Sequence, residues 1–136
     1  MRVLVVNAGS STLKLALLDG EDRTIAASEL AGGATRPGDA ELRRALDSPL
    51  RDADAVGHRI VHGGTRFREA ARIDADTEPA LRELADLAPL HQARSLDALD
   101  AVSQLLPRAP AVACFDTAFH AALPEAAATY ALPASW

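Results

Sequence analysis

Residues 3–19 read VLVVNAGSSTLKLALLD and hold two apolar stretches on either side of a small, hydroxyl-rich turn. The first, Val3–Val6, is a short continuous apolar run, which is typical of a strand buried on both faces. The second alternates, so its leucines share one face of a strand while Thr12 and Lys14 lie on the more polar face. The stretch predicts two neighbouring strands with a polar loop between them.

The rest of the chain alternates between strand and helix patterns, with a loop at residues 32–38. Further strands are expected at Thr24 to Leu30, Ala55 to His62 and Ala111 to Phe115, and helices at Asp39 to Asp47, Thr77 to Leu87 and Ser95 to Leu106. The first three strands in succession predict an antiparallel meander. Ser95 is interpreted as the cap of the last helix. The order β-β-β-α-β-α-α-β predicts an α/β fold, a mixed sheet with flanking helices.

Composition limits the classes of function. The 136 residues are the size of one domain with a real core, and the net charge of −5 argues against a broad nucleic-acid or anionic-membrane surface. We therefore expect no nucleic-acid partner and no membrane. The single cysteine, Cys114, is interpreted as an apolar filler of its strand and cannot form an internal disulfide. No apolar run is long enough for a signal peptide or a membrane span, so the expected location is the cytoplasm.

Lys14 is the only lysine among 14 Lys and Arg residues. Its compact ammonium has three donors and suits phosphate oxygens in a way that a planar guanidinium does not. Backbone amides and hydroxyls of the loop from Asn7 to Lys14 could cradle the same oxygens, and Asn7 offers an uncharged oxygen to a metal. The alternative is a plain hairpin loop that uses glycine and serine for turn chemistry.

The segment Val56–Gly64 holds the next group of candidates. In a strand, His58 and His62 point one way while Arg59 and Val61 point the other. Arg59 offers a bidentate fork for carboxylate or phosphoryl oxygens, and Val61 beside it suits the alkyl tail of a small carboxylate. The alternative is a solvated Arg59. The two histidines resemble a metal pair, but we interpret them as hydrogen-bonded structural residues.

Two more polar residues stand where elements end. His91 lies at a predicted break between two helices, where it points into a cleft or bonds a helix end. Asp116 follows the last strand, with a hydroxyl residue after it. A carboxylate at the carboxyl end of a strand is a natural part of a magnesium shell. The alternative is that Asp116 caps the next turn.

Four motifs together resemble the acetate kinase family: NAGSSTLK (7–14), GHRIVHGG (57–64), APLH (88–91) and FDTAFH (115–120). They stand in that family's order with closely similar spacing, and they match only the amino-terminal part of its protein. The resemblance implies the actin-like ATPase fold, with residues 1–136 as its first, ribonuclease-H-like domain. It also implies reversible phosphoryl transfer between ATP and acetate, giving acetyl phosphate and ADP, with Mg²⁺, in a protein that forms homodimers when intact.

The resemblance implies roles for residues on the nucleotide side. Asn7 is similar to the family's magnesium-site asparagine. Lys14 is similar to its nucleotide-phosphate lysine, and Ser10 and Thr12 occupy the hydroxyl positions between them.

It implies roles on the acyl side as well. Arg59 is similar to the substrate-binding arginine, Val61 and Leu90 to apolar walls of the acetate pocket, and His91 to the histidine beside it. Asp116 is similar to the catalytic aspartate and is also expected at the metal. Acetate resembles a side-chain carboxylate, which has a pKa of about 4, and is already ionised at neutral pH, so a general base has little proton to remove. We therefore expect Asp116 chiefly to organise magnesium and Arg59 to stabilise charge as a catalytic residue.

Two departures from the family pattern bear on function. Gln92-Ala93 stand where the family usually has Asn-Pro, so propionate or butyrate are alternative substrates. The family also continues past residues 131–133 into a second, nucleotide-binding domain whose catalytic and metal-site residues do not lie in this sequence. We therefore expect a first domain that is weak or inactive alone. The alternative is a non-catalytic retained domain that pairs with itself through apolar surface near residues 120–136. Another kinase of the same fold is disfavoured by Arg59 and His91.

Overall fold

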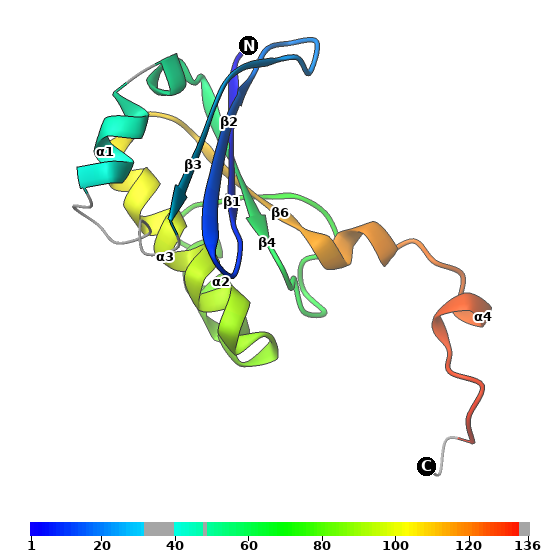
Figure 1. Ribbon diagram of the computed structural model, residues 1–136. Coiled ribbons are helices and arrows are strands. Elements are labelled where there is room, and N and C mark those ends of the chain that lie inside the picture. Colours follow the sequence, from blue (N-terminus) through cyan, green and yellow to red (C-terminus); the bar gives the residue numbers. More distant parts are fainter. Residues whose placement is uncertain (32–39, 48, 134–136) are drawn as a thin grey trace.

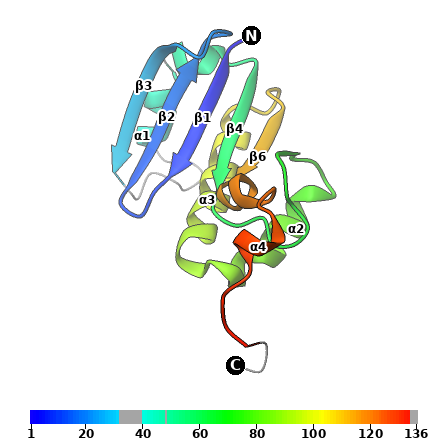
Figure 2. The same ribbon diagram turned by 90° about the vertical axis from the view of Figure 1, so that its right-hand side faces the viewer.

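The computed structural model describes residues 1–31, 40–47 and 49–133. Its centre is a six-stranded mixed sheet in the order β3-β2-β1-β4-β6-β5 (Figure 1, Figure 2). The strands are β1 (Val3–Ala8), β2 (Thr12–Leu18), β3 (Thr24–Ala31), β4 (Ala55–Ile60), β5 (Ala71–Arg72) and β6 (Ala111–Phe115). The prediction of an α/β fold built on a mixed sheet is confirmed.

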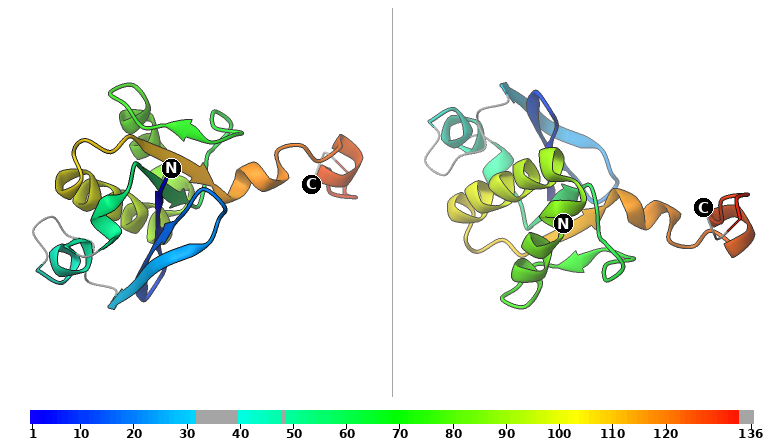
Figure 3. Two further views of the ribbon diagram at one scale, coloured as in Figure 1. Left: turned by 90° about the horizontal axis from the view of Figure 1, so that it is seen from above. Right: turned by 90° about the horizontal axis from the view of Figure 1, so that it is seen from below.

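Three of the four α-helices that the structure describes pack against one side of this sheet (Figure 1). The helices are α1 (Ala40–Leu46), α2 (Thr77–Glu83), α3 (Pro89–Leu105) and the short α4 (Glu125–Ala128), with 3-10 helices at Pro49–Asp52, Leu84–Leu87 and Asp116–His120. The first three lie on one side of the sheet, whereas the chain after β6 leads away on the other side and ends in α4 and its tail (Figure 1, Figure 3).

The first three strands form the predicted antiparallel meander, because β1 pairs with β2 and β2 with β3, both antiparallel. The register sets Lys14 between Asn7 on β1 and Glu29 on β3. On its other side β1 pairs with β4 in parallel, and β4 pairs with β6 in parallel. Three parallel neighbours therefore end at the same edge of the sheet.

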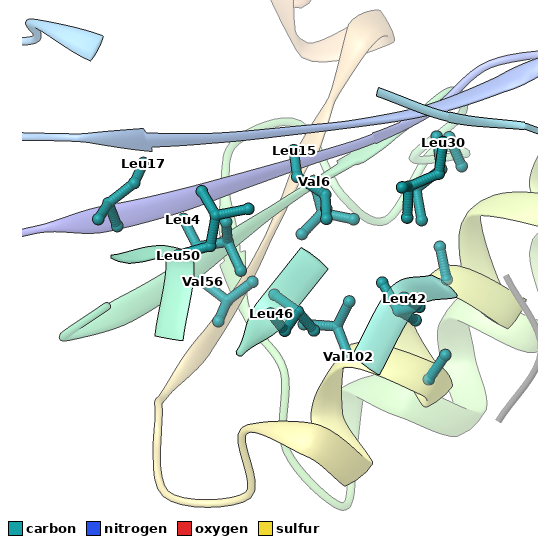
Figure 4. Close-up of a cluster of buried hydrophobic side chains, with 14 residues drawn as sticks. Leu4, Val6, Leu15, Leu17, Leu30, Leu42, Leu46, Leu50, Val56 and Val102 are labelled. Atoms are coloured by element: carbon teal, nitrogen blue, oxygen red, sulfur yellow. The ribbon is translucent and has the colours of Figure 1, made fainter. Parts of the chain in front are cut away.

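The two faces of the sheet differ sharply in burial. The face toward the helices, here called the helix face, carries Leu4 and Leu15, which meet Leu42, Leu46 and other apolar side chains from the helices (Figure 4). The opposite face, here called the open face, alternates with it along each strand and is exposed or half-buried. The predicted alternation in β2 is confirmed, with its leucines buried and Lys14 exposed.

Two predicted boundaries are wrong. Strand β4 ends at Ile60 rather than His62, because the N–H and C=O of His62 bond to the side chain of Gln92 instead of a strand neighbour. Helix α3 begins at Pro89 rather than after Ser95, because proline has the backbone angle of a first helical residue and Ala88 alone makes the break. Ser95 is buried inside the helix, where its hydroxyl donates to the carbonyl of His91 at 3.1 Å.

Other differences are smaller. The two-residue strand β5 and the single-turn α4 were not expected, and the helix predicted over 77–87 divides into α2 and a 3-10 turn. The predicted helix at 39–47 is present as α1, while Asp39 and the expected loop at 32–38 lie outside the described residues. None of the helices in the described ranges is both long enough and apolar enough to cross a membrane.

Candidate active site at the carboxyl edge of the sheet

Three predicted site residues meet at the edge where β1, β4 and β6 end. Asn7 is the penultimate residue of β1, Arg59 the penultimate residue of β4, and Asp116 directly follows β6. Because these strands are parallel neighbours, their carboxyl ends place the three side chains together. The strand order thus brings together residues separated by more than 50 positions in the sequence.

The Arg59 guanidinium joins the other two side chains. Its Nε lies 2.9 Å from Oδ1 and 3.1 Å from Oδ2 of Asp116, and its Nη2 lies 2.6 Å from Oδ2. Its Nη1 donates to Oδ1 of Asn7 at 2.9 Å. The pairing with Asp116 is the bidentate fork that arginine makes with a carboxylate, and it fixes the plane of the guanidinium.

The Arg59–Asp116 pair remains open to solvent. The two side chains are 45% and 40% exposed, so the pair contributes little to stability. The hydrogen bonds that Arg59 donates to Asp116 raise the pKa of Arg59 above its ordinary value. A guanidinium has five N–H groups, and these bonds use three of them. One N–H on each terminal nitrogen is left without an acceptor among the described residues.

Lys14 lies across the β1–β2 pair from Asn7. Its Nζ is 3.9 Å from a carboxylate oxygen of Glu29, which is a loose surface contact. The loop between the strands is closed by a bond from the Gly9 N–H to the Thr12 carbonyl at 2.8 Å. Ser10 is exposed and Thr12 half-buried. A backbone bond thus closes the predicted phosphate-binding loop, while Lys14 and the Ser10 side chain face solvent.

The residues predicted to line the acyl pocket are half-buried or exposed. Val61 is half-buried in the bend after β4 rather than in the strand beside Arg59. Leu90 is 81% exposed and His91 is exposed, both in the first turn of α3. The structure thus joins Asn7, Arg59 and Asp116, and it leaves Leu90 and His91 on the surface.

The histidine interpretation is half right. His62 is hydrogen-bonded, since its Nδ1 accepts the N–H of Gly64 at 2.8 Å. His58 is buried on the helix face, and neither ring nitrogen has a partner among the described residues. Burial lowers the pKa of His58 to about 4, so the ring is neutral. The described part of the chain contains no group of three or more His, Cys, Asp or Glu side chains arranged to hold a metal.

The interpretation of Cys114 as an apolar filler is wrong. Its thiol lies on the open face of β6, beside Arg59 in the register, and it is exposed. Partial burial raises the pKa of this thiol, which keeps it protonated at neutral pH.

Sequence reasoning missed two residues that support the site. The Thr117 hydroxyl accepts the N–H of Gly63 at 3.0 Å, and the Arg94 guanidinium donates to the carbonyl of Ser10. Thr117 stands next to Asp116, and that position is the sequence feature from which a role could have been inferred. Arg94 is 84 residues from Ser10, and no local pattern indicates their contact.

Comparison with known proteins places this chain in a family. The model of the acetokinase family matches residues 39–136. The acetate kinases of Thermotoga maritima and Methanosarcina barkeri are 35% and 36% identical over 98% of this chain, which is 41% and 40% of their own length. The chain therefore spans about two fifths of the length of the curated relatives that it matches.

Solved structures agree with this match. A propionate kinase from Francisella tularensis has a TM-score of 0.80 at 30% identity over 98% of this chain and 41% of its own. An acetate kinase from Entamoeba histolytica has a TM-score of 0.77 at 28% identity over 98% of this chain and 39% of its own. The expected fold, the ribonuclease-H-like first domain of the actin-like ATPase fold, is confirmed. This chain belongs to the acetokinase family.

Proposed function

We propose that this chain supplies the acyl side of a site for phosphoryl transfer between ATP and a short-chain carboxylate, with acetate, propionate and butyrate as candidate substrates. The observation that supports the proposal is the cluster of Arg59, Asp116 and Asn7 at the carboxyl edge of the sheet. The cluster combines a cation with unused donors, a carboxylate and an uncharged oxygen. Membership of the acetokinase family points to the same chemistry.

Arg59 is the proposed substrate-binding and catalytic residue. Its two unused N–H groups match the two oxygens of a carboxylate or the equatorial oxygens of a phosphoryl group. Asp116 holds the guanidinium plane while Arg59 meets the substrate. In the transition state, the same cation would stabilise charge on the phosphoryl group as it moves between two oxygens.

Asn7 and Asp116 are the proposed magnesium residues. Both present oxygen atoms within hydrogen-bond distance of one guanidinium, so these oxygen atoms lie close together. Carboxylate and amide oxygens are ligands that Mg²⁺ prefers. One carboxylate and one amide are a sparse set, which suits a cation that takes its other ligands from phosphate and water. When bound, the cation would neutralise charge on the nucleotide phosphates.

The remaining residues have simpler proposed roles. Lys14 and the hydroxyls of Ser10 and Thr12 would bind nucleotide phosphate oxygens at the other end of the site. Because acetate is ionised at neutral pH, no residue needs to act as its base. Val61, Leu90 and His91 would border the alkyl group. Leu90 and His91 are exposed and the Arg59 cluster is open to water, so we expect turnover by this chain alone to be weak.

The direct test is acyl phosphate formation from magnesium-ATP and each of the three carboxylates, with hydroxylamine as the trap. We expect product from the wild type and at least about a 100-fold loss in Arg59→Ala, because a preorganised charge donor is removed. Arg82→Ala is the matched control. Its side chain is also 45% exposed and bonds two carboxylates, but it lies on α2 away from the site. Equal loss in both variants, or product from Arg59→Ala at the wild-type rate, would contradict the proposal.

Binding can be measured even where turnover is too slow to detect. Acetate titrated into the labelled chain should shift the Arg59 Nε–H resonance with a saturable curve, and the shift should disappear in Asp116→Asn because the guanidinium is no longer oriented. A straight, unsaturable response of the wild-type resonance would argue against a carboxylate site.

A second candidate function is self-association without catalysis. Large apolar side chains after β6 are exposed, among them Phe119 at 87% and Tyr130 at 86%, and this segment leaves the body on the side of the open face (Figure 2). Such surface favours association. Sedimentation velocity separates the candidates. A dimer that persists in Asp116→Asn and dissociates in Phe119→Ser, with no acyl phosphate formed by either, would favour the second function.

A further inference from the structure

Three consecutive backbone N–H groups follow the end of β4, and a side chain accepts each one. His62 N–H bonds Oε1 of Gln92 at 3.3 Å, Gly63 N–H bonds the Thr117 hydroxyl at 3.0 Å, and Gly64 N–H bonds the ring of His62 at 2.8 Å. In a strand or helix, backbone carbonyls would accept these groups. The path of the chain here is therefore set by side chains, two of which come from α3 and from the turn after β6.

Gln92 makes the most extensive of these contacts. Besides accepting the His62 N–H, its Nε2 donates to the His62 carbonyl at 3.1 Å, so one side-chain amide pairs with both polar groups of one backbone residue. The side chain is fully buried in the first turn of α3. A buried amide is tolerated when its hydrogen bonds are made and is costly when they are not. Gln92 therefore holds α3 and the end of β4 in one relative position.

We propose that Gln92 is the positioning residue of the acyl site. Val61 precedes His62 by one residue, and His91 precedes Gln92 by one residue. The pair of bonds between His62 and Gln92 therefore fixes the separation of the two backbone points from which Val61 and His91 emerge. This inference rests on the proposed function, because it assigns these two side chains to the border of a carboxylate site.

The surrounding structure limits other paths for this segment. A Cβ atom at Gly63 would lie 2.2 Å from the Phe67 carbonyl oxygen and 3.1 Å from the ring of Phe115, so the backbone is packed tightly there. The nucleotide side has a bond of its own to α3, because Arg94, two residues after Gln92 on that helix, donates to the carbonyl of Ser10. Loss of the Gln92 bonds should therefore disturb the acyl side and spare the phosphate-binding loop.

The test is Gln92→Met in the whole chain, which keeps the length of the side chain and removes both bonds. The matched control is Gln104→Met, at an exposed position on the same helix. We expect amide hydrogen exchange at His62 and Gly63 to rise about tenfold, since one net hydrogen bond is worth about that factor, while exchange at Leu15 in the core is unchanged. Acetate should bind about tenfold more weakly, and pyrophosphate should bind as to the wild type. Gln104→Met should match the wild type in all these measurements.

Other outcomes would contradict either the positioning role of Gln92 or the proposed function. Unchanged exchange at His62 would overturn the positioning role. Equal weakening of acetate and pyrophosphate binding would overturn it too, because it would indicate a general loss of structure. If the wild type bound no acetate while exchange at His62 rose in Gln92→Met, the proposed function would fail and the anchoring of the segment would stand. Gln92→Asn, which keeps the amide and shortens its reach, gives the same comparison if Gln92→Met does not fold.

Discussion

The helix face and the open face of the sheet differ although they come from the same strands. Along β1, Leu4 and Val6 are buried under the helices, while Asn7, one residue further, reaches the site. Along β4, Ile60 is buried and its neighbour Arg59 bonds Asp116. A strand turns successive side chains to opposite faces, so one element supplies both the core and the candidate site.

This difference separates the residues that stabilise the fold from the residues of the candidate site. The helix face buries large aliphatic side chains, whose removal leaves cavities. The open face holds exposed charged pairs, which contribute little to folding. Substitutions on the helix face should therefore change stability, and those on the open face should change ligand binding at nearly constant stability.

The largest effect is expected from a core truncation. Leu15→Ala on the helix face should lower the free energy of unfolding by about 2–5 kcal/mol, because Leu15 is almost fully buried. Val5→Ala, on the half-buried open face of the neighbouring strand, should cost about 1 kcal/mol. Urea unfolding followed by circular dichroism measures both. Similar losses in the two variants would mean that the open face is also part of the core.

The next effect is a loss of stability at low pH, and it comes from His58, which is buried on the helix face of β4 next to the exposed Arg59. Burial lowers the pKa of His58 from 6.5 to about 4 in the folded state. Between these values the unfolded chain binds more protons, so folding loses stability as pH falls from about 6.5 to about 4. The full stabilisation is present above pH 6.5, and the loss amounts to about 3 kcal/mol from this residue.

Unfolding free energies measured from pH 7.5 to 4.5 test this effect. The difference between the wild type and His58→Met should shrink or change sign toward acid, because the variant has no proton to bind. The control is His120→Gln, at an exposed position after β6, which should follow the wild-type curve. Parallel curves for the wild type and His58→Met would show that His58 is not the titrating group.

A smaller effect on stability is expected at Gly63, in the bend that follows β4. Gly63→Ala should destabilise by about 1–3 kcal/mol, because its Cβ would lie 2.2 Å from the Phe67 carbonyl oxygen. Gly57→Ala is the comparison within β4. Its Cβ would meet only a Val3 methyl at 4.0 Å, so we expect no loss of stability. Thermal unfolding of the two variants side by side measures the difference, and a neutral Gly63→Ala would show that the bend has room to move.

Much of the fold could be predicted because its main signals are local. The alternation of leucines with Thr12 and Lys14 predicted the buried and the exposed face of β2. The position of polar residues at strand ends indicated Asn7 and Asp116 as candidate site residues. The meeting of those residues follows from the parallel order of β1, β4 and β6, which a resemblance to a known fold supplies and periodicity alone does not.

The failures have physical causes that lie outside the local pattern. The end of β4 is set by Gln92, which is 30 residues away from His62. The start of α3 was misplaced because a proline fits both a break and a first helical turn. The burial of His58 without partners is likewise decided by what packs over it and not by its neighbours in sequence.

The smallest effect on stability is expected at Lys14, and it tests the open face most directly. Its ammonium lies 3.9 Å from Glu29 with both side chains more than half exposed, so Lys14→Arg should change the unfolding free energy by less than about 0.5 kcal/mol. Binding should respond differently, because a guanidinium is planar and cannot offer its donors as a compact ammonium does. We expect pyrophosphate to bind several-fold more weakly by calorimetry, with Arg51→Lys, at an exposed pair remote from the site, as control. Full affinity in Lys14→Arg would mean that the charge alone suffices and that the single lysine of this chain has no special part in phosphate binding.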